Sequence, residues 1–414
     1  MKTNSLVRFI VVCFALFLAV CGGDNGGGYE CVSGGSGTIK EDPYVVCTAV
    51  ELKELADRLN NGTEESSGKF YKLGANIDLS KTGTNWKPIG NYRDPSFKGT
   101  FDGNGKTISG LSINRSASDL YLDYLGLFGK IDGGTVTKLK LDVTILGSYS
   151  YYLGGVVGSL SNGSVSECVV NGHVIGRDNV GGVAGRVENS SISNCSATNL
   201  VRGDYYVGGV VGRAENSSIS NSYATGGVSG NYRVGGVVGS LGGSISNSYA
   251  TGDVSGSGDR IGGVAGRAEN SSITYSYATG SVRGYNFVGG VVGNLIGSSS
   301  VEGCAALNPS ISRYLSTITT SFGRVAGDVE PGGVLTNNVA YSGMTVLGVT
   351  VSDSDGNGTG ITYGTGAGQI NNLGTYSGAP PFVGATGGLG WLFGNNDANP
   401  WVWNNTLPVL YWQK

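Results

Sequence analysis

The stretch Tyr206–Gly230 reads "YVGGVVGRAENSSISNSYATGGVSG", and close copies of it recur through the middle of the chain. A fixed period marks the copies, because glycine pairs start every 27 residues at Gly154, Gly181, Gly208, Gly235, Gly262 and Gly289. Self-similarity of this length indicates stacked units, each of which buries its apolar face against its neighbours.

Each unit falls into three pieces separated by turn residues, which in this copy are "YVGGVVGRAE", "SSISNSYATG" and "GVSGNYR". No piece keeps a helical period, and a propeller blade needs about 40 residues. The pattern therefore predicts an all-β fold. We expect a three-faced parallel β-helix (β-solenoid) with one coil per repeat, a small helix-containing N-terminal cap and a C-terminal cap. Its strands should lie about 4.8 Å apart.

The fourth unit, "SLGGSISNSYATGDVSGSGDRIGG", tests this register. It lacks one residue before Ile245 and carries one extra residue before Ile261. A deletion at one corner that is offset by an insertion at another keeps stacked strands aligned. A flexible glycine linker would have no register to keep.

Stacking turns each repeat position into a column of side chains. One column should point inward, and the next should hold small buried side chains, including three cysteines. A column of asparagines should bond backbone groups at a corner, and a column of tyrosines should be exposed. The inward column is Val165, Ile192, Ile219, Ile245, Ile273 and Val301, and the column of small side chains is Cys168, Cys195, Ser222, Ser248, Ser276 and Cys304. The asparagine column is Asn194, Asn221 and Asn247, and the tyrosine column is Tyr223, Tyr249 and Tyr277.

The composition narrows the class of protein. Glycine makes up 75 of 414 residues, but it does not recur every third residue and only 9 prolines accompany it, so collagen is excluded. The formal charge is −3, and it becomes −5 without Lys2 and Arg8. A chain of this charge is not expected to bind nucleic acid.

The first residues read as an export signal. Lys2 and Arg8 precede a short apolar run, "FIVVCFALFLAV", which ends just before Cys21. This end resembles a bacterial lipobox, although Val20 departs from the small residue usual before the cysteine. We expect Cys21 to carry lipid as an outer-membrane, surface-facing anchor; plain secretion or a periplasmic location is the alternative. The expected segments are a lipoprotein-type signal peptide (1–20), a flexible tether (21–43), an N-terminal cap with lead-in coils (44–135), the repeat helix (136–327), and a lead-out with a tryptophan-rich cap (328–414).

The repeats and their flanks resemble the GLUG-motif repeats of bacterial surface lipoproteins. The resemblance rests on "VGGVVG" followed by "SISNSYATG", on the lead-in "FKGTFDGNGKTISGLSI", and on the ending "PWVWNNTLPVLYW". It covers roughly residues 44 to 414. It implies a β-helical, surface-exposed or secreted, adhesin-like protein whose ligand is generally not established.

Both ends of a solenoid expose strand edges and need covering. At the N-terminal end "TAVELKELADRLNNG" predicts a helix with a Thr48–Glu51 capping box and a stop at Gly62. At the other end we expect the tryptophans near the C-terminus to form a hydrophobic plug. Cys31 and Cys47 flank one short segment, and in an oxidising setting they are candidates for a disulfide.

Catalytic and metal signatures are sparse. His173 is the single histidine, which excludes a two-histidine zinc motif. Asp353, Asp355 and Asn357 have the first, third and fifth spacing of an EF-hand loop, but Gly364 stands where that loop has glutamate, so we favour a polar turn. No cofactor is expected.

Aromatic and cationic residues recur just before the glycine pairs. Stacked at strand spacing, they would form a strip along one corner, where tyrosine offers contact area at low entropic cost. The candidates are Tyr151, Tyr152, Tyr205, Tyr206, Tyr232, Arg233 and Phe287. We expect a non-enzymatic binding protein for an extracellular glycan or protein. A carbohydrate-active enzyme on the same coil, or a purely structural envelope protein, is the alternative.

Overall fold

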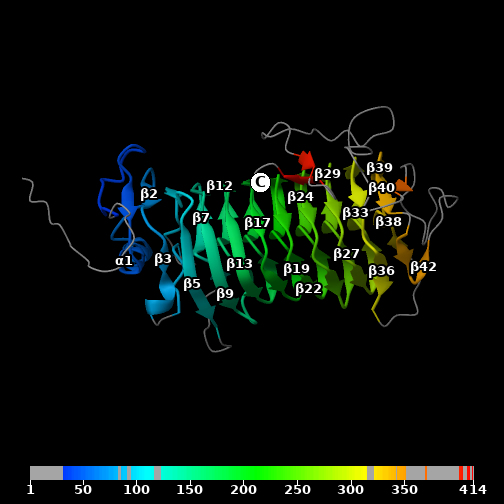
Figure 1. The fold of residues 1–414 in the computed structure, drawn as a ribbon, viewed down its shortest axis with the longest axis horizontal. Helices are drawn as coiled ribbons and strands as arrows, with labels where there is room; N and C mark the ends of the chain where they lie inside the picture. Colours follow the sequence, from blue (N-terminus) through cyan, green and yellow to red (C-terminus); the bar gives the residue numbers. More distant parts are fainter. Residues whose placement is uncertain are drawn as a thin grey trace, which may run out of the picture. The chain divides into compact units, whose positions relative to one another are not determined.

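A computed structural model describes residues 31–414 apart from 83–84, 91–94, 116–122, 315–320, 342, 351–368, 371–400, 404–407, 411–412 and 414. Val32–Lys414 form one compact unit. Its coils stack side by side along one axis, from blue to orange in Figure 1. Of the described helices, none is long and apolar enough to cross a membrane.

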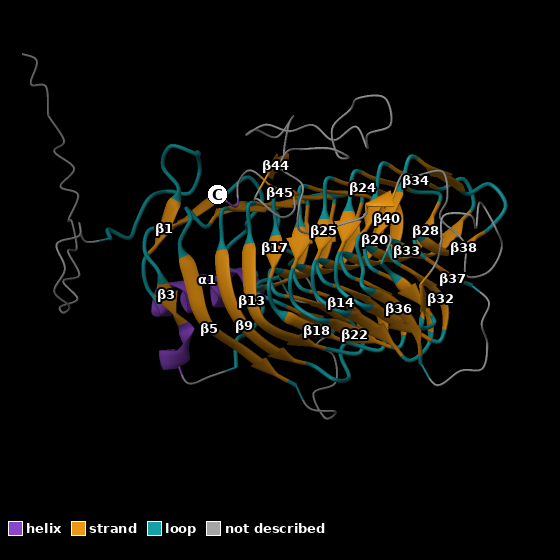
Figure 2. Cartoon of the chain, turned by 45° about the vertical axis from the view of Figure 1, so that its right-hand side comes forward, coloured by secondary structure: helices purple, strands orange, loops and turns teal. Residues whose placement is uncertain are grey.

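The repeat period is the circumference of one coil. In the coil that holds the opening stretch, β19 (Tyr205–Gly208), β20 (Val211–Ser220), β21 (Tyr223–Ala224) and β22 (Val228–Gly230) follow one another. Each pairs in parallel with its counterpart in the next coil, so that Gly208 lies beside Gly235 and Ala224 beside Ala250. The expected parallel β-solenoid of about 27 residues per turn is confirmed (Figure 2).

Three sheets make the three faces. Face 1 is built from one strand of each coil: β6 (Tyr124–Leu125), β10 (Tyr152–Gly154), β14 (Asp178–Gly181), β19, β23 (Tyr232–Gly235), β27 (Asp259–Gly262), β32 (Asn286–Gly289) and β37 (Phe322–Gly323).

Face 2 follows it along the chain. Its strands are β1 (Tyr44–Val46), β2 (Phe70–Leu73), β4 (Thr100–Asp102), β7 (Phe128–Asp132), β8 (Thr135–Thr137), β11 (Val157–Ser161), β12 (Ser164–Ser166), β15 (Ala184–Glu188), β16 (Ser191–Ser193), β20, β24 (Val238–Ser246), β28 (Ala265–Glu269), β29 (Ser272–Thr274), β33 (Val292–Ile296), β34 (Ser300–Glu302), β38 (Ala326–Val329) and β39 (Val334–Thr336).

Face 3 closes each coil. Its strands are β3 (Ile77–Asp78), β5 (Thr107–Asn114), β9 (Lys140–Leu146), β13 (Val169–Ile175), β17 (Ser196–Ala197), β18 (Leu200–Arg202), β21, β22, β25 (Tyr249–Ala250), β26 (Val254–Gly256), β30 (Tyr277–Ala278), β31 (Val282–Gly284), β35 (Ala305–Ala306), β36 (Ser310–Arg313), β40 (Val339–Tyr341), β41 (Thr345–Val346), β42 (Val349–Thr350) and β43 (Gln369–Ile370).

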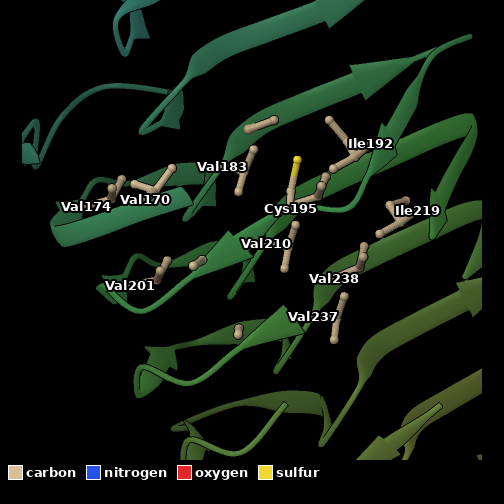
Figure 3. Packing of buried hydrophobic residues seen from close by; sticks show 14 of the residues in the cluster. Val170, Val174, Val183, Ile192, Cys195, Val201, Val210, Ile219, Val237 and Val238 are labelled. Carbon is tan, nitrogen blue, oxygen red and sulfur yellow. The ribbon is translucent and has the colours of Figure 1, made fainter. Parts of the chain in front are cut away.

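The core is a set of apolar columns inside the coils. All members of the Val165 to Val301 column are fully buried, as expected. Figure 3 shows Cys195 pointing into this interior among valines and isoleucines such as Val183, Val210 and Ile192. The three column cysteines are free thiols, and burial raises the pKa of Cys304 to about 12. Buried thiols of this kind are inert packing groups.

A ladder of buried serines, rather than the expected asparagines, bonds the backbone from coil to coil. Ser222 Oγ accepts the amide of Cys195 at 3.1 Å, and Ser248 Oγ accepts that of Ser222 at 3.2 Å. The asparagines of the neighbouring column instead sit in the left-handed conformation, with φ of 52° at Asn194 and 47° at Asn221. Asparagine tolerates that conformation well, so its role here is to turn the corner.

In the fourth unit, the missing residue and the extra residue lie at two different corners. The pairing of β20 with β24 shifts between Glu215 and Ser217, where Gly243 takes up the missing residue at φ 147°. Pairing then returns to the 27-residue interval between Val234 and Ile261. The strands before and after these corners stay aligned.

The N-terminal end is covered as expected. Helix α1 (Ala49–Asn60) begins with the complete capping box of Thr48 and Glu51, and buries one apolar stripe: Leu52, Leu55, Ala56 and Leu59. A single 3-10 turn, η1 (Leu79–Thr82), follows in the first coils. Cys31 and Cys47 are both disulfide-bonded.

The C-terminal hairpin does not plug the far end of the solenoid, which corrects our expectation for Trp401. This hairpin, β44 (Trp401–Trp403) and β45 (Pro408–Leu410), lies against the side of the middle coils (Figures 1 and 2). Trp401 Nε1 donates to Asn247 Oδ1 at 3.2 Å, and its ring lies 5.9 Å from that of Tyr277. Trp391 and Trp412 lie outside the described residues.

Candidate functional site

The predicted strip lies where face 3 turns into face 1, and a backbone feature divides it in two. In β19, Tyr205 pairs with Asp178 and with Tyr232, but Tyr206 has φ of 54°. The equivalent residues of the next three coils, Arg233, Arg260 and Phe287, also have positive φ. A left-handed residue redirects the chain, so neighbouring side chains reach different surfaces.

We call the first part the tyrosine strip, which comprises Tyr151, Tyr205 and Tyr232. The rings of Tyr205 and Tyr232 are stacked, with centroids 5.4 Å apart and an interplanar angle of 9°. Tyr205 and Tyr151 are each 38% exposed. Arg177 lies over the Tyr151 ring at 5.4 Å and donates to its hydroxyl at 3.2 Å. The structure therefore stacks two of the three rings, and Asp178 lies between Tyr151 and Tyr205 in this column.

The second part, the arginine row, comprises Tyr206, Arg233, Arg260 and Phe287, and it lies over face 2. The Tyr206 ring is contacted by Arg213 from β20 at 5.1 Å and by Arg233 at 4.6 Å. Arg260 lies 5.5 Å from the centroid of Phe287. The remaining candidate, Tyr152, lies two coils before Tyr206 in the same column, but its half-buried ring stacks on Tyr124 at 4.8 Å.

A polar groove of about 410 Å³ borders the tyrosine strip. Its lining includes Arg202, Asp204, Asn231 and Ser257, with Tyr314 among the lining residues. Arg283 stacks on the Tyr314 ring at 4.8 Å. These residues were not predicted from the sequence. The signal for Asp204 and Asn231 was their place directly before the paired tyrosines.

One carboxyl beside the groove has a perturbed pKa. Asp178 is half-buried, and this burial raises the pKa of its carboxyl; the charge of Asp204 raises it further, while Arg177 and the amide of Asn179 oppose the rise. Its Oδ1 is buried and, within the described part of the chain, has no hydrogen-bond partner. An acid and a neighbouring carboxylate are the minimum for glycoside hydrolysis.

On face 2, a column of arginines and a column of glutamates lie two residues apart along the strands. Period-two spacing puts both on one side of the sheet, and they form ion pairs. Arg186 bridges Glu188 at 3.3 Å and Glu215 at 2.6 Å, Arg213 pairs with Glu215, and Arg267 pairs with Glu269 at 2.8 Å. Exposed pairs contribute about 0–1 kcal/mol each. This ladder is a solvated face rather than a catalytic constellation.

The tyrosine column expected to be exposed is stacked, and two of its three members are buried, which corrects that expectation for Tyr249 and Tyr277. Tyr249 lies 5.0 Å from Tyr223 and 4.7 Å from Tyr277, with nearly parallel rings. Tyr249 is 3% exposed and Tyr277 1%, because the C-terminal hairpin packs on them. The Tyr277 hydroxyl donates to the carbonyl of Pro408 at 2.8 Å. This column is therefore a docking surface for the chain's own end.

Other candidate groups are placed as follows. His173 is exposed on β13 between Thr144 and Leu200. In the part that the structure describes, no group of three or more His, Cys, Asp or Glu side chains could hold a metal ion. Cys21 and the set Asp353, Asp355 and Asn357 lie outside the described residues.

The coils that carry the tyrosine strip and the arginine row match a known repeat motif. The model of the GLUG motif matches residues 176–201, 203–229, 230–255 and 257–283. The chain carries GLUG repeats. The four GLUG units contain Tyr205, Tyr206, Tyr232, Arg233 and Arg260. The tyrosine strip and the arginine row therefore lie largely within them.

Two relatives are similar in sequence to about a third of the chain. Halomucin of Haloquadratum walsbyi is 33% identical over 154 residues, which is 35% of this chain and 2% of halomucin. A "putative Gly-rich membrane protein" of Evansella cellulosilytica is 34% identical over 138 residues, which is 33% of this chain and 15% of that protein. The chain thus spans a small part of either relative.

One solved structure aligns over most of the chain. It is described as a "putative immunoglobulin A1 protease" from Bacteroides ovatus, and the alignment covers 91% of this chain and 95% of that one. The identity is 18% and the TM-score 0.44.

Proposed function

We propose that this GLUG-repeat protein is a non-enzymatic, adhesin-like binding protein that recognises a glycan or a protein at the tyrosine strip. The observation that carries the proposal is the Tyr205–Tyr232 stack, partly exposed beside a polar groove. Flat aromatic faces next to hydroxyl, amide and charged groups suit a ligand that is apolar on one side and polar on its edge.

The solenoid supports this function as a stiff spacer. Each coil bonds the next through its backbone, so the tyrosine strip keeps its geometry over several coils. The lipid anchor at Cys21 would attach this rod to the outer membrane. A relative named as a membrane protein agrees with membrane attachment.

The direct test is an array of glycans and host-matrix proteins probed with the mature protein. We expect a ligand that is lost in the Tyr205→Ala/Tyr232→Ala variant and kept in Tyr149→Ala, because Tyr149 is 61% exposed but lies outside the stack. A ligand that binds the double variant unchanged would remove the tyrosine strip as its site. For the anchor, palmitate labelling should disappear in Cys21→Ala, and labelling that persists there would defeat it.

A carbohydrate-active enzyme is the second candidate, and Asp178 is the observation that favours it. Its raised pKa and the nearby Asp204 provide two carboxyl groups at the edge of the strip. If the protein is an enzyme, it should release reducing sugar from a polysaccharide and lose that activity in Asp178→Asn. Binding without turnover in the wild-type protein would favour the adhesin-like function.

A further inference from the structure

Four guanidinium groups gather on the outer surface of face 2, two from the arginine row and two from the strands of face 2. Arg213 and Arg267 share one column, and Ser240 lies between them in the intervening coil. The two arginines are therefore two coil steps apart, which corresponds to about 10 Å at the spacing of parallel strands. Arg233 comes from the intervening coil itself, and Arg260 from the same coil as Arg267.

The acids of this surface do not balance the arginines. Arg213 pairs with Glu215 and Arg267 with Glu269. The intervening coil has Gly242 where these two coils have glutamate. Among the ion pairs of described residues, neither Arg233 nor Arg260 takes part. Asp259 and Asp328 interact with the charge of Arg260, whereas no acid is among the groups that shift the pKa of Arg233. The uncompensated positive charge therefore centres on Arg233.

The two unpaired arginines are held by other contacts. Arg233 stacks on Tyr206 at 4.6 Å, and its Nε is buried without a hydrogen-bond partner in the described structure. Arg260 contacts Phe287 and donates from Nε to Asn294 Oδ1 at 3.2 Å. A guanidinium that stacks on a ring keeps its N–H edge for a bidentate acceptor.

The charges around Arg233 indicate that the cluster lacks an anion. Burial lowers the pKa of its guanidinium, and the charges of Arg267, Arg260 and Arg213 lower it further, against the influence of Tyr206. These like charges are close enough to repel one another. A bound anion would relieve that repulsion and satisfy donors that have no acid of their own.

We propose that Arg233 and Arg260, flanked by Arg213 and Arg267, bind the anionic groups of an acidic polysaccharide that lies along the solenoid axis. This inference rests on the proposed function and names its ligand class. A polymer fits because the cationic positions recur from coil to coil. A polysaccharide fits better than an acidic peptide because the Tyr206 and Phe287 rings of the same row lie beside the guanidinium groups and suit sugar rings.

The experiment measures binding of the mature protein to polygalacturonate, dextran sulfate and uncharged dextran at low salt, about 50 mM. The first two probes distinguish carboxylate from sulfate. We expect binding to at least one of them, not to dextran, with affinity that falls as salt is added. The variant Arg233→Gln/Arg260→Gln should lose about tenfold or more in affinity.

Two control variants distinguish the effect of losing charge from effects on folding and from the position of the charge. Arg233→Lys/Arg260→Lys keeps both charges and should keep most of the binding. Arg313→Gln removes one exposed charge from face 3 and should bind as the wild type does. Each variant should unfold at the wild-type temperature, so that a lost affinity reports on the site.

The outcomes distinguish this inference from the proposed function. A wild-type protein that binds neutral glycans through Tyr205 and Tyr232 but neither polyanion overturns this inference alone. Wild-type affinity in the glutamine variant does the same. Polyanion binding that needs Arg233 and Arg260 but is unaffected by Tyr205→Ala/Tyr232→Ala supports the arginine site and removes the tyrosine strip.

Discussion

Trp401 and Asn247 lie 154 residues apart in the chain, yet the Trp401 indole Nε1 donates a 3.2 Å hydrogen bond to the Asn247 side chain. This contact fixes the C-terminal hairpin to the flank of the solenoid. It also covers the Tyr249 and Tyr277 rings, which would otherwise extend the aromatic surface of face 3.

Replacing Trp401 by alanine should release the hairpin and expose these tyrosines. Burial holds the pKa of both phenols above the usual value, so in the wild-type protein they should ionise only on unfolding. In Trp401→Ala we expect two more tyrosines to titrate near the ordinary pKa of about 10, seen by tyrosinate absorbance. Val402→Ala, in the same hairpin, should titrate like the wild type; identical curves for Trp401→Ala would contradict the docking.

Gly209 should not tolerate a side chain. A Cβ there would overlap the carbonyl oxygen of Gly236 in the next coil and would lie 2.5 Å from Ala224 Cβ. We expect Gly209→Ala to lower the free energy of unfolding by about 1–3 kcal/mol or more, measured by chemical denaturation. Gly227→Ala is the control, because its nearest neighbouring atom would be 3.7 Å away. Equal stability of the two variants would argue against the stacking.

Ser222→Ala should destabilise the coil through one lost acceptor. Ser222 is fully buried, and its Oγ accepts the Cys195 amide while donating to the Ser220 carbonyl at 2.8 Å. Leaving that amide unpaired should cost about 1–3 kcal/mol. Ser222→Cys should cost less, because cysteine fills the same column at Cys168, Cys195 and Cys304. If Ser222→Ala proved as stable as the wild-type protein, the serine ladder would have no role in stability.

Asp178→Asn should stabilise the protein near pH 7. The folded pKa of Asp178 is raised, chiefly by burial, so its contribution to stability is greatest below the unfolded value and is lost as pH rises through the folded pKa. The variant should therefore melt slightly higher than the wild type at pH 7, with the difference closing near pH 3.5.

Asp78→Asn provides a control of opposite sign. Hydrogen bonds from Ser80 lower the pKa of Asp78, so its ionised form stabilises the fold above the unfolded pKa. The asparagine variant should be no more stable than the wild type at pH 7. If both variants shift the melting temperature in the same direction, the assignment for Asp178 fails.

The repeat columns could be predicted from the sequence because a coil brings residues 27 positions apart to the same height. Ile192, Ile219 and Cys195 needed only that interval to be placed in the core. The split between Tyr205 and Tyr206 could not be predicted, because it depends on a left-handed backbone at one residue, which tyrosine and arginine rarely adopt. The asparagine column was likewise assigned the wrong role, because corner geometry gives these residues a left-handed backbone and leaves the coil-to-coil bonds to the buried serines.

The coil, its circumference, its inward columns and the helix that covers its first turn follow from local periodicity and capping, so the amino-acid sequence suffices to predict them. The docking of Trp401, the exposure of individual tyrosines and the lack of an acid beside Arg233 emerge only from the three-dimensional packing. Those outcomes depend on contacts between residues with no fixed interval along the chain, where burial and charge are set by whatever segment packs alongside.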